Sequence, residues 1–196
     1  MAQEQHAGDL PMVEFPGRDE WRAWLEANHV ASAGVCLVIS RTGAAHHTVS
    51  YAEALEVALC FGWIDGQKRR HDASAWLQKF TPRGARSVWS KLNRERAEEL
   101  IARGEMRPAG LREVRQAKAD GRWADAYDPQ RTAIVPDDLQ TELDARPRAK
   151  TFFETLDRAN RYAILWRLQT AKKPETRERR LRQFVEMLER SEKLHP

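Results

Sequence analysis

The sequence predicts an α+β fold, with a small antiparallel sheet covered by helices and followed by an all-helical C-terminal module. Strands are indicated by a β-branched apolar run at residues 34–40 and by period-two alternation at residues 75–81. After residues 128–132, apolar residues recur only at helical spacing. A chain of 196 residues, 41% of them hydrophobic, is large enough for one domain with an appendage or for two small domains.

The N-terminal segment predicts a leader, a helix and a buried strand. Residues 1–16 read as a polar leader that ends in a short extended piece at residues 12–15. Asp19 is expected to cap a helix running to about Asn28, because its carboxylate can accept a backbone N–H of the first turn. Residues 34–40 contain Val-Cys-Leu-Val-Ile, which is typical of a buried strand.

A capped helix and a strand pair are predicted next. Ser50 and Glu53 have the spacing of a capping box, in which each side chain bonds a backbone N–H of the other's residue. The helix that they open is expected to end at Gly62. Residues 68–72 and 75–81 are then expected to pair as antiparallel strands around a short turn.

Glycine and proline mark the helices that follow. Ser90 or Asn93 is expected to cap one helix, which Gly104 closes in a left-handed conformation. Pro108 fits the first turn of another helix, and Gly121 follows its end.

The last third of the chain is predicted to be helical throughout. Residues 128–132 are the best linker candidate, so we expect an α+β domain over residues 1–128 and a helical module over residues 133–196. The expected helices of this module begin near Pro136, Pro147, Asp157 and Pro174.

The composition favours a soluble cytoplasmic protein. No basic and apolar secretory signal is visible at the N-terminus, and no apolar run approaches the ~20 residues of a membrane span. Cys36 and Cys60 lie in apolar runs, so we expect reduced core cysteines rather than a disulfide. The net charge of +4 is mild, so its distribution matters more than its total.

Several short motifs carry a family resemblance. They stand at residues 51–54, 58–66, 80–83, 87–93, 104–106, 117–123, 126–127, 171–177 and at Arg180. In these motifs the chain resembles the bacterial YdeI/OmdA family, also labelled bacteriocin-protection or OmpD-associated. The resemblance extends from about residue 21 to about residue 188. The resemblance implies a stress-response or antimicrobial-resistance role and a terminal helical module. It implies no established enzyme activity.

A dense basic cluster is the main functional signal in the residues themselves. Between Lys68 and Arg96 there are nine Lys or Arg residues and two acidic ones, with Trp76 and Trp89 interleaved. Guanidinium groups bind phosphate in forked pairs and aromatic faces stack on bases, so we interpret the cluster as an anion-binding surface, with nucleic acid favoured. The alternative is a solvated basic face over buried tryptophans. The predicted anion-binding residues are Lys68, Arg69, Arg70, Arg83, Arg86, Ser87, Trp89, Lys91 and Asn93.

The turn after Pro82 is the expected centre of that surface. Arg83, Arg86 and Lys91 are expected to converge there. Free backbone N–H groups at the start of the following helix would add to the attraction for an anion.

An enzyme is the alternative function, with Asp65 as its central residue. A carboxyl beside a tryptophan can act as a general acid or base, and Asp65 follows Trp63 closely. Its expected partners are His71 or Cys60, in a pocket near Trp63. Asp65 is otherwise expected to accept turn N–H groups or to pair with a nearby arginine.

No cofactor or metal is predicted. His46 and His47 are adjacent, but cysteine and acidic ligands at zinc spacing are missing. A further alternative is a protein-interaction module whose C-terminal helices dock a partner or form a homodimer.

Overall fold

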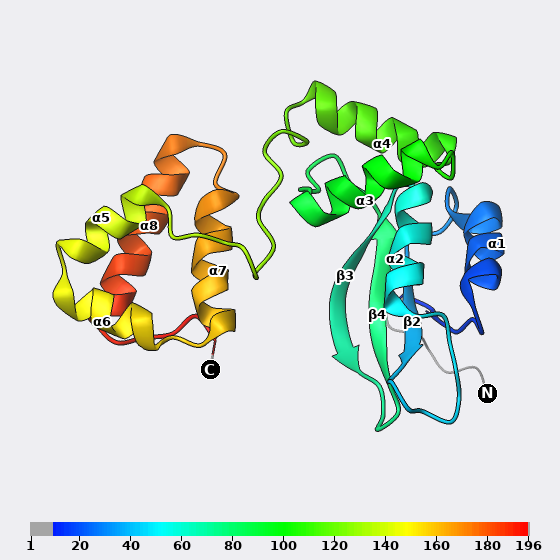
Figure 1. Ribbon diagram of the computed structural model, residues 1–196, viewed down its shortest axis with the longest axis horizontal. Coiled ribbons are helices and arrows are strands. Elements are labelled where there is room, and N and C mark those ends of the chain that lie inside the picture. The colour runs from blue at the N-terminus through cyan, green and yellow to red at the C-terminus, as the bar shows by residue number, and fades with distance from the viewer. Residues whose placement is uncertain (1–9, 196) are drawn as a thin grey trace. The chain divides into compact units, whose positions relative to one another are not determined.

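The computed structural model describes residues 10–195, which divide into two compact units (Figure 1). The first unit comprises the described residues up to Ser87 together with Asn93–Ala124. The second unit comprises Val88–Leu92 and the described residues from Asp125 onward. The first contains the sheet and the second is helical, so the α+β class is confirmed. The first nine residues of the expected leader lie outside the described residues.

The sheet of the first unit has four strands in the order β1-β2-β4-β3. The strands are β1 (Met12–Val13), β2 (Val35–Ser40), β3 (Trp63–Arg70) and β4 (Ala75–Pro82). The β2-β4 and β3-β4 pairs are antiparallel, as expected, whereas β1 joins β2 in parallel and makes the sheet mixed. Of the expected strand at residues 68–72, residues 68–70 form the end of a longer β3, which begins at Trp63, and residues 71–72 lie beyond it.

A bulge interrupts the pairing of β3 with β4. Asp65 lies opposite Phe80, but the next pair is Lys68 opposite Gln78. The chain therefore has two residues, Gly66 and Gln67, where regular pairing would have one. This extra residue changes which side chains of β3 face the core.

Four helices are assigned mainly to the first unit. They are α1 (Arg18–Asn28), α2 (Tyr51–Cys60), α3 (Lys91–Ala102) and α4 (Pro108–Ala119). The first two residues of α3 belong to the second unit. Helix α2 lies in front of the sheet in Figure 1, and it contacts β3.

The predicted start of α2 is confirmed, and that of α1 is corrected. Ser50 Oγ accepts the Glu53 N–H, and the Glu53 carboxylate accepts the Ser50 N–H, which together form a capping box. The hydrogen bonds from Ser50 lower the pKa of Glu53. Helix α1 instead has Gly17 at its N-cap, and Asp19 lies in the first turn, where its charge faces the positive end of the helix dipole.

Aromatic side chains fill the core between α1, α2 and the sheet. Trp21 is fully buried, its ring centroid lies 5.7 Å from that of Phe80, and its Nε1 donates to Ala54 O at 3.1 Å. Trp63 meets Trp21 edge-on at 6.4 Å. The indole N–H bond satisfies the one polar group of Trp21 that burial would otherwise leave unpaired.

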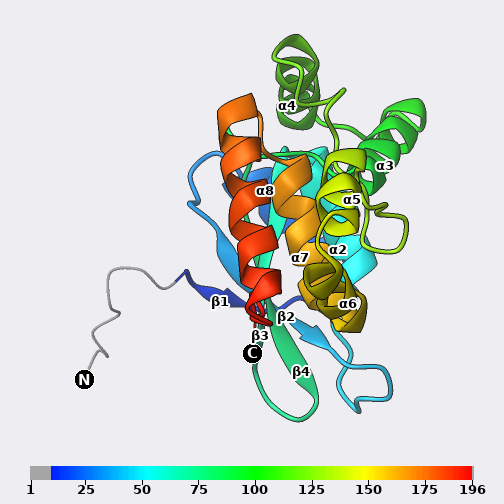
Figure 2. The same ribbon diagram turned by 90° about the vertical axis from the view of Figure 1, so that its left-hand side faces the viewer.

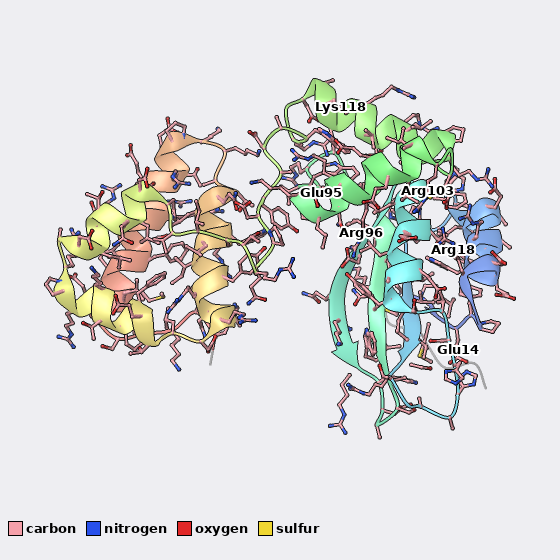
Figure 3. All side chains as sticks on the ribbon, in the orientation of Figure 1. Glu14, Arg18, Glu95, Arg96, Arg103 and Lys118 are labelled. Carbon is pink, nitrogen blue, oxygen red and sulfur yellow. The ribbon has the colours of Figure 1, made fainter. Side chains whose placement is uncertain are left out.

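An ion-pair network joins α1, α2 and the α3–α4 loop at the surface of the first unit. Arg18 pairs with Glu56 at 2.9 Å and with Glu105 at 2.7 Å, and Arg103 pairs with Glu105 at 2.8 Å. Figure 3 shows Arg18 and Arg103 on these elements. Although partial burial opposes it, the neighbouring arginines lower the pKa of Glu105.

Helix α4 approaches the end of α2 so closely that only glycine fits at position 110. A Cβ added to Gly110 would lie 2.4 Å from Cys60 O and 2.7 Å from Leu59 O. Both atoms belong to the backbone and cannot move aside as a flexible side chain can. The absence of a side chain at Gly110 is thus a packing requirement.

The second unit is a cluster of helices that packs around its own core. Its helices are α5 (Asp137–Asp144), α6 (Pro147–Thr155), α7 (Arg158–Gln169) and α8 (Pro174–Glu189). Helices α7 and α8 lie side by side in Figures 1 and 2. The predicted starts at Asp157 and at the prolines are confirmed, since Asp157 accepts the Asn160 N–H at 2.8 Å. The buried core residues are Leu139, Leu143, Ala149, Phe153, Leu156, Ile164, Leu165, Leu168, Phe184, Val185 and Leu188.

Asp128 is tied down, although the sequence places it in a linker. Its carboxylate pairs with Lys91 at 2.5 Å and accepts from Gln169 Nε2 at 2.8 Å. Its backbone N–H donates to Gln169 Oε1 at 3.1 Å. Lys91 and Gln169 lower the pKa of Asp128. The domain boundary at this point stays a prediction.

Replacing Gly110 with alanine should destabilise the protein, although alanine is normally the better helix former by about 1 kcal/mol. The overlap with two backbone carbonyls outweighs that propensity, so we expect a loss of about 2 kcal/mol in the free energy of unfolding. Chemical denaturation measures it. Gln116→Ala, on an exposed position of the same helix, is the control and should change stability little. A Gly110→Ala protein as stable as the wild type would contradict this packing.

Removing the Asp138–Arg177 ion pair should destabilise the protein in a pH-dependent way. The Arg177 guanidinium, 2.7 Å from the carboxylate, lowers the pKa of Asp138 from its ordinary 3.8. The pair therefore stabilises the folded state above about pH 4, and this contribution is lost as the pH falls through the folded pKa. Asp138→Asn should lower the melting temperature at pH 7, with a difference that shrinks below pH 4.

Thermal melts between pH 7 and pH 3 measure this difference. Asp137→Asn, in the same helical turn but exposed, is the matched control. A difference that stayed constant down to pH 3 would argue against the ion pair.

Candidate functional site

The β3–β4 hairpin carries exposed cations. We call Lys68, Arg69, Arg70 and Lys79 the hairpin cations, and all of them are exposed. In the part of the chain that the structure describes, no carboxylate forms an ion pair with any of them. Exposed and unneutralised cations of this kind are available to an anionic partner.

The hairpin cations project from both faces of the sheet. Residues that pair directly across two strands share a face, so Lys68 and Arg70 lie on the same face as their partners Gln78 and Trp76. That is also the face of buried Phe80 and of α2. Arg69 and Lys79 lie on the opposite face.

An open depression beside Lys68 forms what we call the hairpin cleft. Its volume is about 310 Å³, and its lining residues are Tyr51, Asp65, Gly66, Lys68, Trp76 and Gln78. Helix α2 contributes Tyr51, β3 contributes the next three and β4 the last two. The cleft thus combines an acid, a base, an amide and two aromatic rings.

Hydrogen bonds fix the walls of the hairpin cleft. Tyr51 OH donates to Asp65 Oδ2 at 2.8 Å. Gln78, only 4% exposed, donates from Nε2 to Gly66 O at 2.8 Å. The Lys68 ammonium lies 4.2 Å from the centroid of the Trp76 ring, a cation–π contact. Asp65 was expected to accept turn N–H groups or to pair with an arginine, and the tyrosine is its actual partner.

The tip of the hairpin is held by Asp72. Its Oδ1 accepts the N–H of Ser74 at 2.6 Å, the Ser74 hydroxyl at 2.8 Å and the N–H of Ala75 at 2.8 Å. These bonds, led by that from the Ser74 hydroxyl, lower the pKa of Asp72. Asp72 is therefore committed to the turn and leaves the hairpin cations unneutralised.

The residues around the Pro82 turn do not form the exposed cluster that the sequence predicts. Arg83 is 7% exposed, and its backbone N–H donates to Gly62 O at 2.9 Å. Lys91 pairs with Asp128. Trp89, which precedes α3, and Asn93, in its first turn, are both buried.

Two further members of the predicted set remain at the surface. Arg86 is exposed. Ser87 Oγ accepts the Gly84 N–H at 3.0 Å and so closes the turn. The accessible part of the predicted anion-binding set is thus Lys68, Arg69, Arg70 and Arg86, and its binding of an anion stays a prediction.

The proposed catalytic partners of Asp65 do not come together. Cys60 is fully buried, and burial raises the pKa of its thiol, so it is a poor nucleophile. His71 lies at the hairpin tip, with Nε2 at 3.7 Å from Asp72 Oδ2. His71 lies six positions after Asp65 in the sequence, which is roughly 20 Å of extended chain. The expected grouping of Asp65 with His71 or Cys60 is therefore corrected.

Trp63 lines a different depression from Asp65. That depression, about 150 Å³ in volume, also includes Gly62, Arg83 and Arg112. The two side chains differ in burial, since Trp63 is 1% exposed in the core and Asp65 is half-buried. The expectation of one pocket that holds Asp65 beside Trp63 is therefore corrected.

The adjacent histidines of the β2–α2 loop form no metal site with described residues. His46 Nε2 lies 2.6 Å from Glu14 Oε1. Among residues 10–195, no group of three or more His, Cys, Asp or Glu side chains could hold a metal ion.

The second unit has a mainly apolar cleft of about 220 Å³. Ile134, 77% exposed, and Leu165 line it beside Asp128 and Gln169. The polar groups of Asp128 and Gln169 bond each other there. Docking of a partner or of a second copy by these helices stays a prediction.

Tyr51 and Gln78 are the site residues that sequence reasoning missed. Tyr51 belongs to one of the motifs that carry the family resemblance. Gln78 lies between two aromatic residues, each two positions away in the predicted strand. The sequence signal for the bulge was Gly66, because a glycine inside a strand often marks a bulge.

The geometry defines an α+β protein with a basic hairpin and a separate helical unit. The chain belongs to the family described as Domain of unknown function (DUF8412), whose model matches residues 13–113, more than half of the chain. Residues 132–191 match the model described as Bacteriocin-protection, YdeI or OmpD-Associated. This match confirms the YdeI/OmdA resemblance for the C-terminal part.

Other comparisons add no relatives. No curated protein and no solved structure matches the chain. Across residues 10–195, the structure contains no helix that is both long enough and apolar enough to span a membrane.

The Tyr51–Asp65 hydrogen bond should contribute to stability. Tyr51→Phe removes a donor to a carboxylate, so we expect the free energy of unfolding to fall by about 1–2 kcal/mol. The same substitution in an Asp65→Ala background should have a much smaller effect. Chemical denaturation of the two single variants and the double variant gives the coupling energy, and additive effects would show that the bond does not form.

Proposed function

We propose that this protein is a non-enzymatic cytoplasmic binding protein with a bacteriocin-protection or stress-response role. We propose further that it binds nucleic acid through the hairpin cations. The family match at residues 132–191 supports the role by its description. Cys36 and Cys60 are both free, which suits a reducing compartment.

One observation carries the binding proposal: the hairpin cations are exposed and have no carboxylate partners. Elsewhere in the described chain, cations such as Lys91 and Arg177 are neutralised by Asp128 and Asp138. Phosphate groups release bound counterions when Lys or Arg neutralises them, and this release drives association at low salt. An unneutralised hairpin is therefore a surface that would gain from contact with a phosphate backbone.

The aromatic neighbours of the hairpin cations favour a single strand over a duplex. Trp76 and Tyr51 line the cleft beside Lys68. Bases of a single strand are free to contact such rings, whereas those of a duplex are stacked inside it.

Binding of a fluorescent 20-mer single strand, measured by anisotropy across a salt series, tests the proposal. Four phosphate contacts predict a slope of about −3 for log K against log salt. The Lys68→Ala/Arg69→Ala/Arg70→Ala variant should reduce the magnitude of the slope by about 2 and weaken binding at least about tenfold at low salt.

The control is Arg112→Ala/Arg115→Ala/Lys118→Ala, which removes the same number of exposed cations from α4. Figure 3 shows Lys118 on that helix. The control should bind nearly as the wild type does. Absent binding at low salt, or an equal loss in both variants, would refute the hairpin as the nucleic-acid surface.

A further inference from the structure

The bulge in β3 brings an acid and a base to the same face of the sheet. In a regular strand, residues three apart point to opposite faces. Asp65 and Lys68 are three apart, yet they lie opposite Phe80 and Gln78, which share the core face. Bulges commonly re-aim side chains next to functional sites. Here the extra residue places Asp65 and Lys68 together in the hairpin cleft.

The cleft offers two hydrogen-bond acceptors that no described residue uses. Asp65 Oδ2 is bonded by Tyr51, and no donor among the described residues bonds Oδ1. Gln78 uses Nε2 for Gly66 O and keeps Oε1 without a donor in that same part of the chain. Gln78 is 4% exposed, so the bond to Gly66 fixes the orientation of its amide.

Besides the buried indole N–H of Trp76, which has no partner among the described residues, the cleft offers the ammonium of Lys68 as a donor. This ammonium lies over the Trp76 ring and has no carboxylate partner among residues 10–195. Arg70 projects from the same face two residues further along β3. A ligand that fits this arrangement carries adjacent N–H donors for Asp65 and Gln78, and an anionic group for Lys68 and Arg70.

We propose that the hairpin cleft receives one unstacked base of a bound single strand and prefers guanine. This inference rests on the proposed nucleic-acid binding and adds base selectivity to it. Guanine alone among the common bases presents two adjacent N–H donors, N1–H and the 2-amino group, on its Watson–Crick edge. Both match the acceptors Asp65 and Gln78, while the strand's phosphates face Lys68 and Arg70.

The other bases match the cleft less well. Adenine and cytosine present one amino group beside a ring nitrogen acceptor, and uracil presents one N–H between two carbonyls. Each would bring an acceptor against the Asp65 carboxylate, and an unpaired polar group in a partly desolvated contact reduces affinity. The volume of about 310 Å³ is at the low end of small-molecule sites, which suits one base.

Competition between matched oligonucleotides tests the inference. Ten-mers of uracil that carry a single central guanine, adenine or cytosine are compared with the all-uracil strand at constant salt. The guanine strand should bind at least about fivefold more tightly than the others, the low end expected of a bidentate base contact.

Modified bases test the contact without changing the protein. Inosine lacks the 2-amino group and should lose most of the preference, whereas 7-deazaguanine changes only the far edge and should keep it. Loss of the preference with 7-deazaguanine, or its survival with inosine, would overturn the assignment.

Protein variants separate the cleft from the hairpin cations. Asp65→Asn replaces an acceptor with a mixed donor and acceptor, and should remove the guanine preference while preserving the salt slope. Arg69→Ala/Arg70→Ala, which leaves the lining residues of the cleft intact, should weaken all strands and leave the ranking of the bases unchanged. Circular dichroism and melting confirm that each variant is folded.

The outcomes distinguish this inference from the proposed function. Salt-dependent binding without base preference would refute the guanine site and leave nucleic-acid binding intact. No binding of any strand would refute both. Tighter binding of free amino acids than of GMP, measured by calorimetry, would assign the cleft to a zwitterionic ligand and also overturn the inference.

Discussion

The site depends on one hydrogen bond, from the buried Gln78 amide to the Gly66 carbonyl. It is 2.8 Å long and joins the side chain of β4 to the bulged backbone of β3. A buried amide without this partner would incur the cost of an unsatisfied polar group, so the bulge and the glutamine stabilise each other. The bulge in turn decides which side chains of β3 reach the cleft.

Basic residues serve different purposes at different places in the chain. In the second unit, Arg177 bonds Asp138 and also Leu168 O, and Lys91 bonds Asp128, so these two basic residues serve its structure. On the hairpin of the first unit, Asp65 and Asp72 are occupied by Tyr51 and by the turn, and the basic residues have no acidic partner among those described. Arg177 and Lys91 thus have a structural role, whereas the hairpin cations stay unneutralised. The separate family matches fall along the same division of the chain.

Local signals in the sequence predicted most of the fold. The capping box at Ser50 and Glu53 and the left-handed closure at Gly104 are short-range arrangements, so their spacing alone defines them. The β3–β4 turn is equally local, because Asp72 bonds residues two and three positions away. The parallel pairing of β1 with β2 was not predictable, since strand partners distant in sequence leave no periodic signal.

The candidate site was only partly predictable, because a count of charges does not reveal burial. Lys68, Arg69 and Arg70 are exposed as expected, but Arg83 and Trp89 point into the interior. The sequence pattern around Pro82 is the same for an arginine that binds an external anion and for one that packs inward. Tyr51 reaches Asp65 only through the packing of α2 on β3, a tertiary contact that no spacing rule encodes.

The two thiols differ in accessibility, and this difference allows one of them to be labelled with a chemical probe. Cys60 is sealed in the core, whereas Cys36 is half-buried on β2 and pairs in register with Lys79. A thiol-reactive fluorophore would therefore modify Cys36 selectively. Its dye would sit beside a hairpin cation, on the face of the sheet opposite the cleft, in a protein with no engineered residue.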